Sequence, residues 1–149
     1  MIKRREATHR YEPFRWQRGT KVPMSVIRRF AREVAEQFDP LKIILFGSYA
    51  YGRPHRDSDV DILVVMPAYD EINQCVRIRK KTYHPFPLDL IVRKPETLRW
   101  RLDEGDWFLR EIVSKGKVLY EKTDLLLGSK GGRRLARTAN ARKRRPART

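Results

Sequence analysis

Three short apolar runs, each rich in β-branched residues, limit what this chain can fold into. They lie at residues 42–46, 60–65 and 88–92; the first ends at Gly47 and the second precedes Pro67. Runs of this length and composition are typical of strands. Segments of helical periodicity separate them, so we expect an α+β fold, an α/β two-layer arrangement of a small mixed β-sheet with flanking helices.

Helical periodicity is clearest ahead of the first run. An amphipathic helix is predicted at residues 25–38, and Asp39 and Pro40 supply its stop. The other predicted elements are helices at 70–83, 96–103 and 106–113 and a last strand at 117–120. The expected apolar side of the helix at 70–83 consists of Ile72, Cys75 and Val76.

Positive charge is concentrated toward the C-terminus. The net charge is +16 over 149 residues, and residues 129–149 contain nine Lys or Arg and no acid. We therefore predict a basic N-terminal arm at 1–22, one domain at 23–124 and a basic, disordered tail at 125–149. Such a tail would bind nucleic acid or another polyanion weakly and without sequence preference.

The cysteine content and the N-terminus indicate the compartment. Cys75 is the only cysteine, which excludes an internal disulfide and a cysteine metal cluster. Residues 1–10 lack the apolar core of a secretory signal, and no run approaches the roughly 18 apolar residues that a membrane span needs. We expect a cytoplasmic protein without membrane contact.

The stretch that carries chemistry joins the first two predicted strands. At Gly47 and Ser48 a missing or small side chain lets backbone N–H groups approach a ligand, and the turn that follows can present a helix N-terminus to phosphate. Asp59 and Asp61 flank one residue of a predicted strand, so they point to the same face about 6.5–7 Å apart. Two carboxylates on one face can clamp a divalent cation.

A third acid lies in the third predicted strand. Asp89 stands between Leu88 and Leu90, an apolar setting in which an acid is unexpected unless a metal or a partner charge compensates it. Three carboxylates could hold two metal ions. The plainer alternatives are a solvated strand edge for Asp59 and Asp61 and an exposed strand residue for Asp89; the coincidence of the acids with the Gly-Ser pair favours function.

The spacing of these residues resembles a known signature. Gly47-Ser48, ten intervening residues and then Asp59-x-Asp61 is similar to the motif of the DNA polymerase β-type nucleotidyltransferase superfamily. Asp89 falls where that family keeps its third acid. Because the glycine-serine pair, the paired acids and the third strand acid occur together, the match is more specific than any one piece.

The similarity extends over about residues 25–121 and resembles the minimal nucleotidyltransferases of bacteria and archaea. It implies a polymerase β-like palm fold and an enzyme that moves a nucleoside monophosphate, by family habit AMP from ATP, to a hydroxyl and releases pyrophosphate. The implied catalytic residues, which would also hold two Mg²⁺ ions, are Asp59, Asp61 and Asp89. The implied nucleotide-binding residues are Gly47, Ser48, Arg53 and Ser58.

The chain departs from this family in two respects. Many relatives carry Arg where Tyr49 and Tyr51 stand, which leaves Arg53 or Arg56 as candidates for a triphosphate contact. We expect no counterpart of the helical acceptor-binding domain of larger relatives, because a basic segment follows Tyr120. Because relatives of this size typically pair with a helical HEPN-domain protein in a toxin–antitoxin system, the resemblance implies a HEPN-type partner that is also the acceptor.

A non-catalytic alternative stays open at this stage. The chain could be a binding module that neutralises a helical partner or carries nucleic acid on its basic arms, with a vestigial nucleotide site. Trp100 and Trp107 are expected in the core or at a partner contact rather than as base-stacking platforms. None of the expected acids is missing or reversed in charge, which favours the enzyme.

Overall fold

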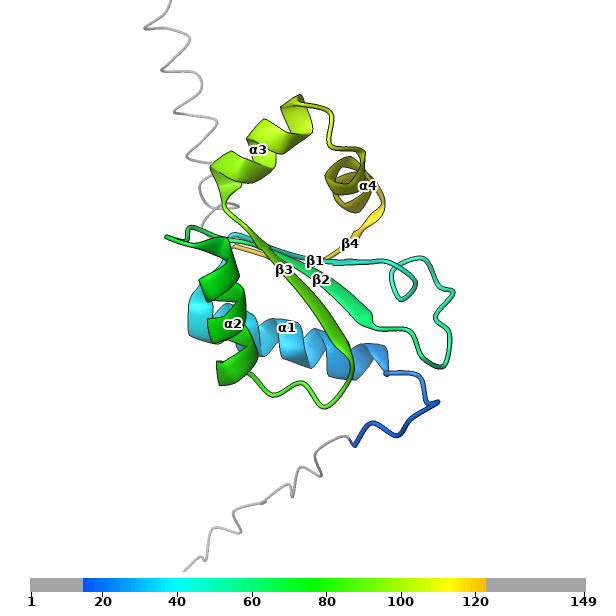
Figure 1. The fold of residues 1–149 in the computed structure, drawn as a ribbon. Coiled ribbons are helices and arrows are strands. Elements are labelled where there is room, and N and C mark those ends of the chain that lie inside the picture. Colours follow the sequence, from blue (N-terminus) through cyan, green and yellow to red (C-terminus); the bar gives the residue numbers. More distant parts are fainter. Residues whose placement is uncertain (1–14, 123–149) are drawn as a thin grey trace, which may run out of the picture.

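A four-stranded sheet lies between two pairs of helices in the computed structural model, which describes residues 15–122 (Figure 1). The elements are α1 (Met24–Phe38), β1 (Lys42–Phe46), β2 (Val60–Val65), α2 (Glu71–Lys81), β3 (Leu88–Arg93), α3 (Pro95–Asp103), α4 (Trp107–Lys115) and β4 (Lys117–Glu121). Every helix and strand predicted from the sequence is present. The predicted basic tail, from residue 125, lies outside the described residues.

The sheet is mixed, as predicted, with the strand order β3-β2-β1-β4. β1 is antiparallel to both β2 and β4, whereas β2 and β3 are parallel and are joined through α2. The end of β1 and the starts of β2 and β3 therefore meet at one end of the sheet. The residues singled out in the sequence lie at that end.

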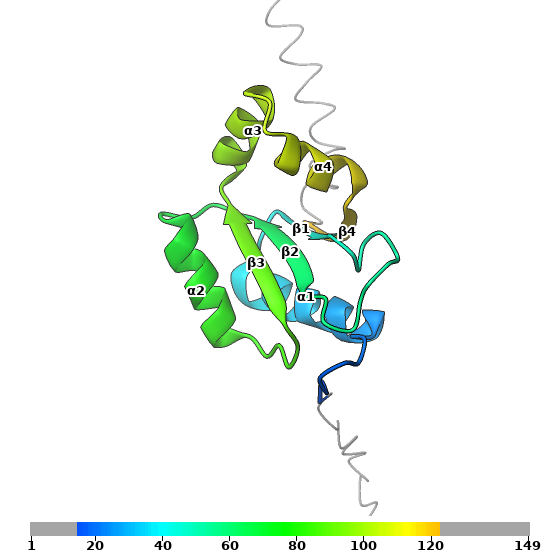
Figure 2. The same ribbon diagram turned by 45° about the vertical axis from the view of Figure 1, so that its right-hand side comes forward.

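One face of the sheet is covered by α1 and α2 (Figure 2). Alternate residues of β2 are fully buried there: Val60, Ile62 and Val64. The apolar stripe of α1 packs on them and consists of Ile27, Phe30, Ala31 and Val34. This stripe is the periodic set that predicted the helix, so this layer forms as the sequence pattern requires.

The opposite face carries a smaller cluster under α3 and α4. The strands contribute Ile44, Phe46, Leu63 and Val65, and α4 contributes Leu109 and Ile112. α3 has no fully buried residue and touches this cluster only through the partly buried Leu98 and Leu102. This second layer therefore covers its face less completely than α1 and α2 cover theirs.

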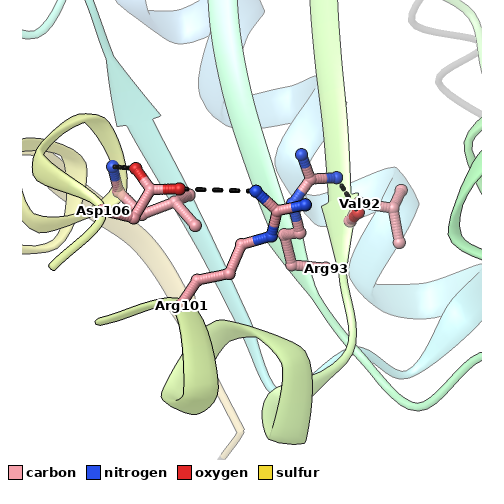
Figure 3. A network of polar contacts seen from close by, with 5 residues as sticks. Val92, Arg93, Arg101 and Asp106 are labelled. Carbon is pink, nitrogen blue, oxygen red and sulfur yellow. Dashed lines mark hydrogen bonds and ion pairs between the residues drawn. The ribbon is translucent and has the colours of Figure 1, made fainter. Parts of the chain in front are cut away.

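The connection between α3 and α4 is fixed by Asp106 (Figure 3). Its carboxylate accepts a hydrogen bond from the Leu109 backbone N–H at 3.0 Å, which confirms the predicted cap of α4, and it pairs with Arg101 at 3.5 Å. Nearby, the Arg93 guanidinium donates to the Val92 carbonyl at 3.0 Å. The two contacts of Asp106 set where α4 begins.

The predicted apolar side of α2 is wrong. Ile78 is buried and Cys75 packs on the core, where its thiol donates to the Leu90 carbonyl at 3.2 Å, whereas Ile72 and Val76 are exposed. α2 contacts β3 along the line that joins Cys75 and Ile78, one helical turn apart. The apolar residues of this helix do not fall on one stripe, so the sequence alone did not decide which of them would be buried.

Part of the predicted N-terminal arm contacts the domain. Val22 is buried, and its backbone N–H donates to the Tyr49 hydroxyl at 3.0 Å. Trp16 packs on the core, and its indole N–H donates to the Thr20 carbonyl at 3.0 Å. Within residues 15–122, no helix has the length and apolar character that crossing a membrane requires.

Candidate active site

Two of the predicted acids are neighbours in the sheet. Asp61 of β2 and Asp89 of β3 are register partners on adjacent parallel strands, which places their backbones about 4.8 Å apart with side chains on the same face. Asp59 lies one residue before β2 rather than inside it, because the ladder with β3 begins at Val60, whose N–H donates to the Pro87 carbonyl at 2.8 Å. All three acids are thus at the start of the parallel pair.

Asp89 is more exposed than its apolar neighbours suggested. Leu90 is buried on the α1–α2 side of the sheet, and Leu88 is partly buried against the same cluster. Because successive side chains of a strand alternate between faces, Asp89 points to the opposite side, toward solvent. The expectation that its surroundings are apolar was therefore wrong, although its placement beside Asp61 does not depend on it.

Asp61 is harder to ionise than a free carboxylic acid. Partial burial, followed by the charges of Asp89 and Asp59, raises the pKa of Asp61 from 3.8 to about 6. Within residues 15–122 no Lys, Arg or His forms an ion pair with any of the three. The site is therefore a cluster of acids with which no basic side chain of residues 15–122 is paired.

The oxygen atoms of this acid cluster suit a hard divalent cation. Carboxylate oxygens are the ligands that Mg²⁺ prefers, and it commonly takes only one or two from the protein, completing its shell with water and substrate phosphates. In the described part of the chain, no three acidic, histidine or cysteine side chains converge into a ready-made metal cage. Asp61 and Asp89 are the pair already adjacent, and Asp59 is close enough to raise the pKa of Asp61.

Gly47 stands directly against the acids. It follows Phe46, the register partner of Asp61 on β1, and adopts a left-handed conformation with φ of 68°. A Cβ atom here would collide with the carboxylate of Asp61. Glycine is therefore required twice, for the backbone conformation and for the close approach. Its carbonyl accepts the N–H groups of Ala50 and Tyr51 at 3.0 and 3.1 Å.

The loop between β1 and β2 contains turns and no helix, so the expected helix N-terminus after Gly47 is absent from it. Ser48 is half-buried, and its backbone carbonyl accepts a hydrogen bond of 3.0 Å from the Arg53 backbone N–H. The Arg53 side chain extends into solvent. The Ser58 hydroxyl accepts the His55 N–H at 2.6 Å and so fixes a turn. Local hydrogen bonds therefore occupy Ser58, and Arg53 does not pair with the acids.

Sequence reasoning missed an aromatic edge beside the acids. Phe46 shares its face with Asp61, and the ring of Phe108 in α4 packs edge-on against it, with centroids 5.8 Å apart and planes at 87°. Trp107 in turn packs edge-on against Phe108 at 6.3 Å. No local signal in the sequence links Phe46 to Trp107 and Phe108, which lie 61 and 62 positions later. Only the packing of α4 on β1 brings these rings together.

Comparisons with known proteins identify the family of this chain. Residues 27–120 match the family described as Nucleotidyltransferase domain. A curated relative from Methanocaldococcus jannaschii, named "Putative protein adenylyltransferase", is 37% identical over 81 residues, covering 53% of this chain and 77% of the relative. The chain belongs to the nucleotidyltransferase domain family. The resemblance in the motif is thereby confirmed, as is the predicted enzyme class, a nucleotidyltransferase.

Two solved structures are also similar. A putative nucleotidyltransferase from Sulfolobus solfataricus aligns with a TM-score of 0.48 at 19% identity, covering 67% of this chain and 81% of that one. A mutant of the toxin-antitoxin MntA-HpeT aligns with a TM-score of 0.44 at 20% identity, covering 83% and 94%. Both likenesses are distant, and membership of the family rests on the sequence matches.

Proposed function

We propose that this nucleotidyltransferase moves AMP from ATP to a hydroxyl group of a separate protein and releases pyrophosphate. The observation that carries the proposal is the meeting of Asp61, Asp89 and Gly47 at one end of the sheet, with Asp59 beside them. Gly47 lies in close contact with the Asp61 carboxylate, and no basic side chain of residues 15–122 pairs with the acids. Such a site is suited to a metal-bound triphosphate.

The three acids would hold two Mg²⁺ ions. Partial burial, followed by the charges of Asp89 and Asp59, raises the pKa of Asp61, and a bound divalent cation would offset the repulsion by those charges. Bound cations would supply charge stabilisation for the entering and leaving oxygens of an in-line displacement. Asp59 and Asp61 are the proposed ligands on the triphosphate side, and Asp89 is the proposed shared ligand nearest the acceptor.

The protein's own groups would position the reactants and move one proton. The acceptor oxygen attacks the α-phosphorus, the bond from that phosphorus to the oxygen bridging the β-phosphate breaks, and the electron pair leaves with pyrophosphate. Asp89, exposed toward solvent, accepts or orients the proton of the attacking hydroxyl. The backbone at Gly47 and Ser48 holds the leaving phosphates.

The proposed acceptor is a helical protein of the HEPN type, which brings its own Tyr, Ser or Thr hydroxyl. The M. jannaschii relative is named as a protein adenylyltransferase, which supports a protein acceptor. Asp89 lies on a face of the sheet that α3 and α4 cover incompletely, and Trp100 of α3 is 60% exposed. A docked partner would use such an exposed aromatic as an anchor.

Transfer of label tests the proposal. The chain is incubated with α-³²P-labelled ATP and Mg²⁺, with and without a candidate HEPN-type partner protein, and the labelled species is identified on a denaturing gel. Label on the partner that disappears in the Asp59→Asn variant supports the proposal. Stable complex formation without label on either protein would favour the non-catalytic binding module instead.

A further inference from the structure

Two aromatic side chains at the start of α4 are exposed without an evident structural reason. Trp107 is 73% exposed and Phe108 is 41% exposed, whereas the buried face of the same helix is formed by Leu109 and Ile112. Large apolar rings gathered at a protein surface commonly mark a ligand or partner site.

These rings adjoin the acid site through a continuous set of contacts. Phe46 lies across from Asp61 in the β1–β2 ladder and on the same face, a separation of about 5 Å between side-chain origins. Phe108 packs edge-on against Phe46 at 5.8 Å, and Trp107 packs edge-on against Phe108 at 6.3 Å. The aromatic edge therefore starts one strand away from the proposed metal ligands and extends away from them.

We infer that Trp107, supported by Phe108, stacks on the base of the nucleoside triphosphate. The inference rests on the proposed function, because it takes the phosphates to lie at Asp59, Asp61 and Gly47. From there the sugar and base must extend past one wall of the site, and the described aromatic wall is the Phe46–Phe108–Trp107 edge. Every base has a π-face, so stacking of this kind binds without selecting one base.

Contacts within the protein fix the position of the first turn of α4, which carries Trp107 and Phe108. Asp106, immediately before Trp107, caps α4 through the Leu109 N–H and pairs with Arg101 (Figure 3). The start of the helix is thus fixed before any ligand arrives, which lowers the entropy that binding must overcome. Because both interactions occupy Asp106, its carboxylate is not positioned as a dedicated reader of the base.

Trp100 provides a matched control. It is also a largely exposed tryptophan, at 60%, but it lies on α3. Within residues 15–122 it has no ring contact with Phe46, Phe108 or Trp107. A general effect of removing a surface tryptophan would therefore be the same at both positions, whereas an effect on base binding is expected at Trp107 alone.

The first test uses fluorescence of the full chain. The chain has three tryptophans, so Trp16→Phe with Trp100→Phe leaves Trp107 as the only reporter. The probe is an ATP analogue with a methylene group in place of the α–β bridging oxygen, which cannot transfer AMP, added with Mg²⁺. Stacking predicts that the analogue quenches Trp107, whereas Mg²⁺ with tripolyphosphate, which has no base, leaves the emission unchanged.

The second test compares affinities by calorimetry. Trp107→Ala is expected to weaken binding of the ATP analogue, and of the matching GTP analogue, by the same factor of roughly 5 to 100. Binding of tripolyphosphate should not change, and Trp107→Phe should retain most of the affinity. Trp100 is proposed only as an anchor for the partner protein, which is absent from this assay, so Trp100→Ala should bind the analogue like the unaltered chain. Circular dichroism checks that each variant is folded.

The outcomes separate this inference from the function on which it rests. If the unaltered chain binds the ATP analogue in a manner that needs Asp59 and Asp61, but Trp107→Ala binds it equally well, the stacking inference is overturned and the proposed function stands. Equal losses for the ATP analogue and tripolyphosphate would also overturn it, since the ring would then act on the phosphates. If neither compound binds the unaltered chain with Mg²⁺, the proposed function and the inference fail together.

Discussion

The two faces of the sheet differ in how completely helices cover them. On the α1–α2 face, Val60, Ile62 and Val64 of β2 are all fully buried. On the other face, Leu63 and Val65 are buried under α3 and α4, but Asp61 at the same strand's start is only partly buried. β2 therefore contributes only apolar side chains to the core on one face, whereas on the other face its apolar side chains are followed by the Asp61 carboxylate.

The difference shows where the fold tolerates a cost in stability. A complete layer of apolar side chains stabilises the domain, while the incomplete layer leaves room for three acids that repel one another. Substitutions at residues adjacent in the chain should therefore have different effects: a change at Asp61 should affect metal binding and AMP transfer, whereas a change at Ile62 should affect stability.

The largest effect is expected from the acids beside β2. Asp59→Asn with Asp61→Asn should lower AMP transfer by roughly 10³-fold or more, because losing metal-derived charge stabilisation costs several kcal/mol at the transition state. The rise in thermal midpoint caused by Mg²⁺ with ATP should disappear as well. Labelled-ATP assays and thermal denaturation measure the two effects.

Ile62→Ala, on the opposite face, is the control for that variant. It should reduce the free energy of unfolding by about 2–5 kcal/mol, because it leaves a cavity in the complete layer. The Mg²⁺-dependent shift in the thermal midpoint should persist in the folded fraction. A full shift in the double Asn variant would show that the cation binds elsewhere.

The next effect concerns Asp89, which is exposed and is proposed to act on the attacking hydroxyl. Asp89→Ala should lower transfer by about 10²-fold or more, the scale typical of proton-transfer catalysis, while ATP affinity falls much less. Single-turnover transfer and equilibrium binding separate the two quantities. An equal loss in both would place Asp89 in nucleotide binding rather than at the reacting hydroxyl.

A smaller effect should distinguish two glycines of the β1–β2 loop. Gly47 and Gly52 both adopt positive φ, at 68° and 76°, so alanine should cost roughly 1–2 kcal/mol of stability at either position. At Gly52 the added Cβ meets nothing, whereas at Gly47 it collides with the Asp61 carboxylate. Gly47→Ala should therefore lose about 1–3 kcal/mol more and weaken Mg²⁺ binding. Urea denaturation and Mg²⁺ titration provide the comparison, and equal losses would contradict the close approach.

The smallest effect is the dependence of metal-free stability on pH. The folded chain raises the pKa of Asp61 from 3.8 to about 6, so between about pH 4 and pH 6 the unfolded state releases this proton first and stability falls as pH rises. Above about pH 6 the full penalty remains, about 1–2 kcal/mol once solvent screening of this half-exposed group is included.

Asp61→Asn removes that penalty. In the presence of EDTA the variant should be more stable than the unaltered chain by that amount at pH 7.5, and the two should converge near about pH 4. Urea denaturation at both values measures the difference. A variant that is less stable at pH 7.5 would mean that Asp61 makes a favourable contact which outweighs its repulsion.

The sequence predicted the elements well because their signals are local. Apolar runs of strand length and the stripe Ile27, Phe30, Val34 each depend on neighbours a few positions away. The acids were found for the same reason, since Asp59-x-Asp61 and Gly47-Ser48 are local motifs. That Asp89 would be the register partner of Asp61 follows only from the parallel pairing of β2 with β3, which the sequence does not encode locally.

The misses come from packing between distant segments. Asp89 was expected in apolar surroundings because its neighbours in the chain are leucines, but alternation along an edge strand turns it to solvent. Trp107 was expected in the core or at a partner contact; the core alternative is wrong, because Trp107 is exposed beside Phe108, which packs on Phe46, and the partner contact stays a prediction. In both cases the decisive neighbour lies far away in the sequence.

The most direct test of the account is the intact mass of the proposed acceptor. The chain is co-expressed with a candidate HEPN-type partner, the complex is purified through a tag on the chain, and the intact mass of the partner is measured by mass spectrometry. The mass is expected to increase by one or more AMP units, and this increase should be lost in Asp59→Asn. A partner that co-purifies with unchanged mass after incubation with saturating ATP and Mg²⁺ would contradict it.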